Sequence, residues 1–270
     1  MGKLDSILIV GCGNMGGAML RGWLAGGLDP ARFTVVDPQL AEAPAGVTLL
    51  RELPEQVDGV VVLGVKPQGF ADVAAALAPR LAPSTLVLSM LAGIELASLA
   101  AALPQARAWV RVMPNLAAAL GKSPMALAGR QVDQATQDSV TALLAPLGTA
   151  EWIAEAQFDL ATALVGSGPA FVYRFIDALA AGGAALGFAP EQSERLALAM
   201  VEGAAQLARE SSRSPAELAR MVASPGGTTE AGLTVLDAQD ALARLVQATL
   251  QAARDRGAEL AAYAGAPKEG

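Results

Sequence analysis

Short apolar runs recur along the first 155 residues, separated by longer alanine- and leucine-rich segments. Each run is apolar throughout, which is typical of strands buried on both faces of a sheet. The five clearest runs are Ile7–Val10, Phe33–Val36, Val60–Val65, Leu86–Met90 and Ala108–Val112. Weaker runs at Met125–Ala128 and Ala150–Ile153 are expected to complete the sheet, and helical segments lie at Met15–Ala25, Phe70–Leu77 and Glu95–Leu103. This alternation predicts a parallel sheet with right-handed helical crossovers.

The pattern changes near residue 155. Alanine-rich helical segments follow at about 157–187, 190–211, 214–223, 229–237 and 239–264. Gly187 with Pro190, and Ser214 with Pro215, are typical places for one helix to stop and the next to begin. The sequence therefore predicts an α/β domain over residues 1–155 followed by an all-helical domain over residues 156–270.

The helical half also indicates self-association. The segment 157–187 has few polar positions to face water, and small side chains let helices approach closely. A monomeric bundle is the alternative. The apolarity favours a homodimer or a larger homo-oligomer.

A glycine-rich loop follows the first strand directly. Gly11-Cys12-Gly13-Asn14-Met15-Gly16 sets G-x-G-x-x-G between a strand and a helix, the context in which this pattern binds a dinucleotide pyrophosphate. Gly11 permits the tight turn, Gly13 lets the ligand approach the backbone, and Gly16 allows the helix to pack closely on the strand. The first half is thus predicted to be a Rossmann-type dinucleotide-binding domain. Cys12 is interpreted as a small filler, because no basic residue stands near it in sequence.

Asp37 closes the second strand, 24 residues after Gly13. An acid here accepts hydrogen bonds from the adenosine ribose hydroxyls and repels a 2′-phosphate. An ordinary turn aspartate before Pro38 is the alternative. Residues 38–50 contain no lysine or arginine. The cofactor is therefore expected to be NADH or NADPH, with Asp37 favouring NADH.

Three further strand ends carry candidate cofactor contacts. Ligands of doubly wound sheets lie outside the carboxyl ends of the strands, and Val65-Lys66-Pro67 closes the third strand there. The alternative for Lys66 is a surface lysine before a proline loop. Ala92 in the loop 89–93, and Asn115 in Met113-Pro114-Asn115, occupy the equivalent ends of the next two strands. They are expected to line a nicotinamide pocket.

The second half offers two glycine-rich clusters. Gly166-Ser167-Gly168-Pro169-Ala170 lies near the head of a long helical segment, where it frees backbone N–H groups or simply starts the helix. Ser224-Pro225-Gly226-Gly227-Thr228-Thr229 lies between two helical segments. Its backbone donors are suited to cradle a carboxylate, although a tight loop before an N-capped helix explains it as well.

Composition excludes several classes of chemistry. The 270 residues include no histidine and one cysteine, so neither a Ser-His-Asp triad nor the usual zinc sites can be built, and no metal site is expected. Net charge is −7, without a basic run to follow a nucleic-acid backbone. No apolar stretch approaches the ~20 residues of a membrane span, and no signal peptide is visible. The chain is expected to be cytoplasmic and to act on a small molecule.

Taken together, the motifs resemble those of pyrroline-5-carboxylate reductases. The segment Met221–Thr229, continuing through Ala231-Gly232 to Leu236-Asp237, is similar to the signature of that family. The family also shows G-C-G-N-M-G at the start, V-K-P, M-P-N and G-S-G-P-A, and all occur here in order. Leu116 and Ala117 depart from the family pattern after Asn115, as does Leu91, where the family often has a small residue. All three lie near the expected nicotinamide pocket.

The resemblance implies reduction of 1-pyrroline-5-carboxylate to L-proline, the last step of proline synthesis. It also implies a helical dimerisation domain, further assembly into decamers, and a substrate site near the dimer interface. The loop of Ser224, Gly226, Gly227 and Thr228 would bind the substrate carboxylate, and Thr229 would contact the imine nitrogen. A cyclic imine is already electrophilic, so holding it against the hydride donor, worth about 7–11 kcal/mol in favourable models, suits a chain without histidine.

Two other functions fit parts of the sequence. β-Hydroxyacid dehydrogenases resemble this chain in the G-x-G-x-M-G start and the helical second domain, but they use a lysine of that domain. Residues 151–267 contain none, and Lys268 stands in the tail. A nucleotide sensor on the same fold would have no reason for the second cradle at 224–229.

Overall fold

The computed structural model describes residues 5–265, which fall into two compact units. One comprises the chain up to Gly166 together with the segment from Ala252 onward, and the other runs from Ser167 to Gln251. The first unit therefore extends to residue 166, beyond the expected boundary at residue 155. The domain ranges 1–155 and 156–270 stay a prediction, and Lys268 lies outside the described residues.

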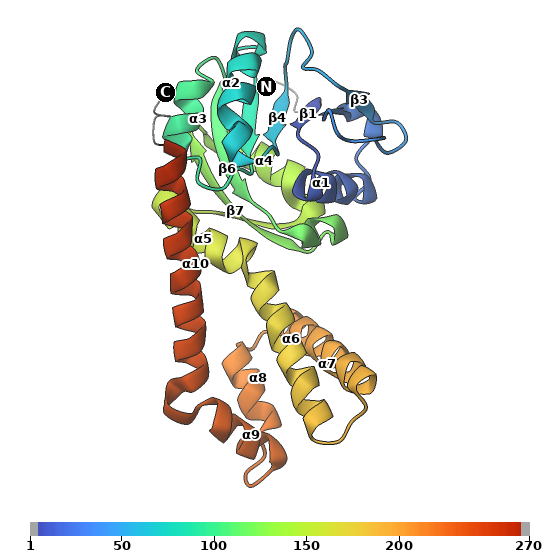
Figure 1. The fold of residues 1–270 in the computed structure, drawn as a ribbon, viewed down its shortest axis with the longest axis vertical. Coiled ribbons are helices and arrows are strands. Elements are labelled where there is room, and N and C mark those ends of the chain that lie inside the picture. The colour runs from blue at the N-terminus through green and yellow to red at the C-terminus, as the bar shows by residue number, and fades with distance from the viewer. Residues whose placement is uncertain (1–4, 266–270) are drawn as a thin grey trace. The chain divides into compact units, whose positions relative to one another are not determined.

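The first unit is built on one eight-stranded sheet, in the order β3-β2-β1-β4-β5-β6-β7-β8 (Figure 1). Its strands are β1 (Ile7–Val10), β2 (Phe33–Val36), β3 (Thr48–Leu50), β4 (Val60–Leu63), β5 (Leu86–Ser89), β6 (Ala108–Met113), β7 (Ser123–Arg130) and β8 (Gly148–Trp152). The order reverses between β1 and β4, which makes the crevice outside their carboxyl ends the expected ligand site. The predicted Rossmann-type architecture is confirmed.

Two strands differ from expectation. β7 pairs antiparallel with β6, whereas the alternation predicted a parallel sheet throughout. The residues between them hold only the short 3₁₀ turn Leu116–Leu120, and a parallel crossover needs a dozen residues or more. β3 was not predicted, because three partly exposed residues at the sheet edge leave little apolar pattern.

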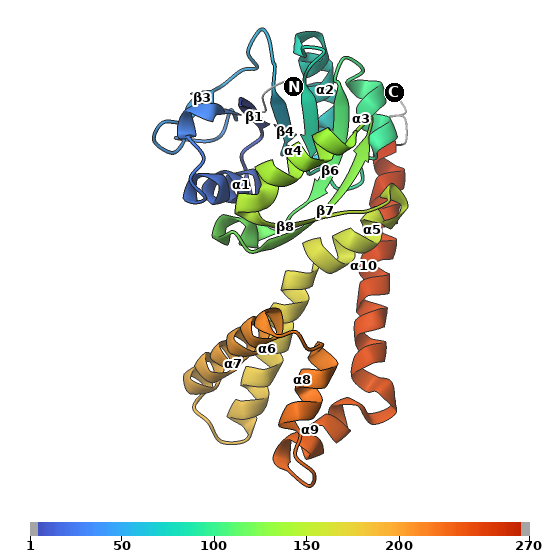
Figure 2. The same ribbon diagram turned by 180° about the vertical axis from the view of Figure 1, so that it is seen from behind.

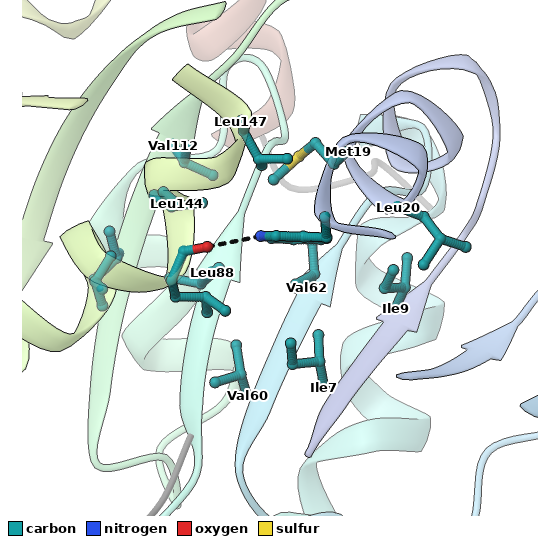
Figure 3. Close-up of a cluster of buried hydrophobic side chains, with 14 of the residues drawn as sticks. Ile7, Ile9, Met19, Leu20, Val60, Val62, Leu88, Val112, Leu144 and Leu147 are labelled. Atoms are coloured by element: carbon teal, nitrogen blue, oxygen red, sulfur yellow. Dashed lines mark hydrogen bonds between the residues drawn. The ribbon is translucent and has the colours of Figure 1, made fainter. Parts of the chain in front are cut away.

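Helices cover both faces of the sheet, with α1 (Asn14–Ala25) and α4 (Gln134–Leu144) on one face and α2 (Phe70–Leu77) and α3 (Leu96–Ala102) on the other (Figures 1 and 2). Alternate residues of β1 serve the two cores: Ile7 and Ile9 face α1, and Leu8 and Val10 face α2. Figure 3 shows part of the first core, where side chains of α1 meet Leu144, Leu147 and the strands. The fully buried Trp23 donates its Nε1–H to the Leu143 carbonyl at 2.8 Å, which ties α1 to α4.

The second unit consists of helices α6 (Gly168–Ala185), α7 (Pro190–Glu210), α8 (Pro215–Val222) and α9 (Thr228–Leu236), and α10 (Ala241–Gly265) carries the chain across the division at residue 251. Between residues 166 and 265 the structure contains no strand, as the sequence predicted. The single helix expected over 157–187 is wrong. It is divided into α5 (Phe158–Ala161), a π-helical turn (Thr162–Gly166) and α6.

Candidate active site

Gly11 and Gly16 each stand in the glycine-rich loop where a Cβ would clash with backbone atoms. Gly11 adopts a φ of +85°, and a Cβ there would lie 2.8 Å from the backbone nitrogen of Val65. A Cβ on Gly16 would lie 2.7 Å from the Gly11 carbonyl oxygen, so helix and loop touch there. A Cβ on Gly13 would meet nothing within 4 Å. The open side of the loop is therefore at Gly13, where α1 begins without a side-chain cap and leaves its first N–H groups available to an anion.

Asp37 braces this loop. Its Oδ2 accepts the Cys12 N–H at 2.8 Å, while Oδ1 accepts those of Gln39 at 2.8 Å and Leu40 at 3.2 Å. Arg51 follows the segment 38–50, which contains no lysine or arginine. Its guanidinium donates to the carbonyls of Asp37 and Pro38. The carboxylate thus shapes the end of β2 as well as facing the crevice. The turn interpretation of Asp37 is confirmed, and its contact with an adenosine ribose stays a prediction.

A cavity of about 790 Å³ opens at this strand edge. Its lining includes Gly13, Asp37 and Lys66, the apolar residues Leu53, Val73 and Ala76, and two arginines, Arg51 and Arg80. Lys66 is exposed and begins the short turn Pro67–Gly69, so its side chain is free to reach into the opening. Size, apolar wall and uncapped helix together fit the adenosine and phosphate part of a dinucleotide.

The residues near the expected nicotinamide pocket differ in how far they are exposed. Leu91 is 3% exposed and packs in the core beneath α2 and α3, so its departure from the family pattern affects packing rather than the pocket surface. Ala92 beside it is half-buried. Leu116 is 55% exposed and lines a second cavity, of about 800 Å³, with Asn14 and Arg21. Of the two leucine departures, Leu91 and Leu116, only Leu116 changes a surface near the glycine-rich loop.

Asn115 is buried and its amide is already engaged. Its Oδ1 accepts the Ala117 N–H at 2.9 Å, and its Nδ2 donates to the Val165 carbonyl at 3.1 Å in the π-helical turn. Gly166 lies against the Met113 sulfur, since a Cβ there would approach it to 3.1 Å. M-P-N and the start of G-S-G-P-A therefore meet in the fold. Contact of the Asn115 side chain with a cofactor stays a prediction, and the amide would have to leave these partners to make it.

Arg111 was not singled out from the sequence. It lies on β6, 3% exposed, with its guanidinium 3.8 Å above the centre of the Phe158 ring and its Nη1 3.4 Å from Glu155 Oε1. The same oxygen accepts the Leu96 N–H at 2.6 Å. Burial lowers the pKa of Arg111, and Glu155 opposes that shift. An arginine within an otherwise apolar strand was the signal available in the sequence.

The loop Ser224–Thr229 joins α8 to α9 in the second unit. Gly226 adopts a φ of +71°, and Gly227 donates its N–H to the Ser224 carbonyl at 2.9 Å and precedes the first turn of α9. Thr229, in that first turn, is half-buried, and Ser224 and Thr228 are exposed. The loop has the shape expected of an anion cradle, but two of its three assigned N–H donors already have partners.

Glu230 is the partner of the Gly226 N–H, and it was not singled out from the sequence. Its Oε2 accepts the Gly226 N–H at 2.7 Å. The signal was present, because an acid three residues after an N-cap commonly reaches back toward the start of the helix. A carboxylate thus lies against the loop that was assigned to a substrate carboxylate.

No described cluster of carboxylates or thiols offers the three ligands that a metal ion would need. Across residues 5–265, none of the helices combines the length and apolarity that crossing a bilayer requires.

Known families match both parts of the chain. Residues 155–260 match the family described as pyrroline-5-carboxylate reductase dimerisation, and residues 6–93 match NADP oxidoreductase coenzyme F420-dependent. A pyrroline-5-carboxylate reductase of Pseudomonas aeruginosa is 40% identical over 268 residues, which cover 96% of this chain and 98% of that protein. The chain belongs to the pyrroline-5-carboxylate reductase family.

Solved structures agree with this assignment. A family member from Coxiella burnetii is 31% identical, with a TM-score of 0.88 over 96% of this chain and 99% of that one. A Plasmodium falciparum pyrroline carboxylate reductase with NADP bound has a TM-score of 0.83 over 95% of this chain and 98% of that one. At 24% identity, that likeness supports the fold alone.

Proposed function

We propose that this chain reduces 1-pyrroline-5-carboxylate to L-proline with a nicotinamide dinucleotide, the last step of proline biosynthesis. Its 40% identity to a reductase of that name, over nearly the whole of both chains, is the observation that carries the proposal. The strand edge around Gly13 and the loop 224–229 are the two parts of the chain whose chemistry suits the reaction.

The dinucleotide supplies the hydride when bound. Gly11, Gly13 and Gly16, with the N-terminus of α1 from Asn14 and Met15, would hold its pyrophosphate, and Cys12 is the filler between them. Asp37 would meet the adenosine ribose, while Val65, Lys66 and Pro67 would line the route towards the nicotinamide. Ala92 and Asn115 are assigned to the nicotinamide end.

In the second unit, the loop would orient the substrate. The N–H groups of Gly226, Gly227 and Thr228 are assigned to its carboxylate, with the Ser224 hydroxyl beside them. Thr229 would hold the ring nitrogen directly or through water. A threonine hydroxyl is a weak acid, so it positions the nitrogen and relays a proton rather than acting as a general acid. The chemical step then depends on orientation, which can supply several kcal/mol, on the order of 7–11 in model reactions.

NADH is the proposed preferred form of the cofactor. Asp37 keeps a negative charge where NADPH carries its 2′-phosphate, and Coulomb repulsion in a partly dry crevice disfavours that phosphate. Arg51 is the first basic residue after β2, and its guanidinium donates hydrogen bonds to main-chain carbonyls of the turn. Arg51 therefore offers less to a 2′-phosphate than its position in the sequence suggests.

The working form is proposed to be a cytoplasmic homodimer or a larger assembly, such as a decamer. Helices α6, α8 and α9 contain no buried residue, although Tyr173 and Phe175 are large and apolar. A helical unit of this kind needs a second surface to cover its apolar side chains.

Complementation tests the function in cells. The chain would be expressed in a bacterium that lacks its own pyrroline-5-carboxylate reductase and needs proline to grow. Growth without proline is expected, with an empty vector as the negative control and added proline as the positive one. Absence of growth despite soluble protein would overturn the proposal.

A further inference from the structure

Glu230 lies where the bound substrate is proposed to place its own carboxylate. Its Oε2 accepts the Gly226 N–H at 2.7 Å. Gly226 lies in the connection between α8 and α9 and holds a φ of +71°. The Glu230 side chain is exposed, so it can leave the loop for water without breaking a packed core.

The contact differs from an ordinary helix cap, and α8 of the same unit provides the comparison. There Glu217, three residues after Ser214, returns to the N–H of the N-cap itself at 2.8 Å. Glu230 stands three residues after Gly227 but does not close on it, because the Gly227 N–H is bonded to the Ser224 carbonyl. Glu230 reaches one residue further out, to the loop donor that has been assigned to substrate.

Two carboxylates cannot easily accept a hydrogen bond from the same N–H donor at the same time. A hydrogen bond to an ionised carboxylate is stronger than one to a neutral oxygen, and two like charges in hydrogen-bonding reach of the same amide repel each other. We propose that Glu230 is an internal competitor for the substrate carboxylate, which occupies the loop until substrate or product displaces it. This inference rests on the proposed function of the loop.

The consequence is a weaker apparent affinity of the loop for its carboxylate ligands. If the loop is free only part of the time, the apparent dissociation constant of any carboxylate ligand rises by the inverse of that fraction. Removing the competitor should therefore lower KM for 1-pyrroline-5-carboxylate and the dissociation constant of L-proline together. We expect a decrease of about three- to tenfold, because an exposed charge-assisted hydrogen bond is only modestly favourable in water.

Three substitutions separate the contact from general charge. Glu230→Ala removes the carboxylate, and Glu230→Gln keeps the shape with a weaker neutral acceptor. Glu230→Asp keeps the charge but is one methylene shorter, so it should not reach Gly226 and should behave like Glu230→Ala. Glu202→Gln, on an exposed position of α7, is the control for net charge.

Steady-state kinetics and calorimetric titration with L-proline give the readouts, after circular dichroism has verified that each variant is folded. The proposal expects Glu230→Ala and Glu230→Asp to lower both KM and the L-proline dissociation constant, with the effect of Glu230→Gln between them and wild type. KM unchanged or raised in Glu230→Ala would overturn it. So would Glu230→Asp matching wild type while Glu230→Ala improves, since the charge alone would then explain the effect. A wild-type chain without imine-dependent oxidation would instead refute the proposed function, and this inference with it.

Discussion

Asp37 accepts a hydrogen bond from the glycine-rich loop and also lines the crevice. Its two oxygens accept three main-chain N–H groups, including that of Cys12. Replacing it by a small residue would therefore change the loop as well as the charge, and a clean test must keep an acceptor in place.

Asp37→Asn keeps the shape of the side chain and one of its two acceptors. The amide oxygen can still accept the Cys12 N–H, the Nδ2 that replaces Oδ1 no longer accepts from Gln39 and Leu40, and the charge that repels a 2′-phosphate is gone. We expect the preference for NADH over NADPH, as a ratio of kcat/KM values, to fall by about tenfold, equivalent to about 1.4 kcal/mol. Glu55→Gln is the matched control, because it removes an exposed acid outside the lining of the cavity. An unchanged ratio in Asp37→Asn would show that Asp37 does not set cofactor choice.

Cys12 provides a second test at this scale. Burial raises the pKa of its thiol, Asp37 adds to that shift, and Arg21 opposes it. A raised pKa means less thiolate at any given pH, and the side chain is only 7% exposed. At pH 8 we expect iodoacetamide to modify the folded chain at least about tenfold more slowly than the same chain in guanidinium chloride. Because Cys12 is the single cysteine, mass spectrometry reads the reaction directly. Equal rates would mean that the loop is open.

Sequence patterns predicted the backbone roles of the glycines, because a tight turn and a close approach are local requirements that only glycine meets. They did not predict where the Asp37 and Glu230 carboxylates point. Those directions depend on N–H groups that become available only once each loop has folded. Leu91 shows the same limit, since its burial in the core depends on α2 and α3.

Elements were predictable where their apolar pattern was continuous. The central strands were found, whereas three-residue β3 and polar-faced α4 were not. α4 did carry a start signal, because Asp133 accepts the Thr136 N–H at 2.8 Å as its N-cap. The interruption between α5 and α6 is tied to a distant residue through the Asn115–Val165 hydrogen bond, which composition within 157–187 could not reveal.

Arg111 and Glu155 join β6 to the segment before α5. Removing a partner from a buried pair is costly when it leaves a charge inside, whereas replacing the buried charge by an apolar side chain is often neutral. We therefore expect Glu155→Gln to destabilise the chain by about 2 kcal/mol, and Arg111→Met to cost less. Denaturant unfolding at one fixed protein concentration checks the order. A larger loss in Arg111→Met would contradict this account and assign the main stabilising role to the guanidinium–Phe158 contact.

At the scale of the whole molecule, the two units differ in how well each is packed. The first has apolar cores on both faces of its sheet. In the second, α7 buries only Ser193 and Ala197. From the apolar, alanine-rich helices the sequence predicted self-association of this half, although the number of subunits has no local signature.

Light scattering during size-exclusion chromatography tests the assembly. A mass of twice 27.3 kDa or a multiple of that dimer is expected. Tyr173→Glu, at an exposed apolar position of α6, should shift the population toward smaller species because it places a charge on a surface that needs cover. Glu202→Gln on α7 should not. A wild-type chain that elutes as a monomer at micromolar concentration would contradict the assignment.

Loss of absorbance at the nicotinamide band tests the central claim most directly. Purified chain would be mixed with 1-pyrroline-5-carboxylate and, in separate runs, with NADH or NADPH. The expected result is rapid oxidation that requires the imine, forms an equal amount of L-proline, is faster with NADH, and is strongly reduced in Thr229→Ala. Folded chain that binds dinucleotide but oxidises neither cofactor in the presence of the imine would contradict the proposed reaction.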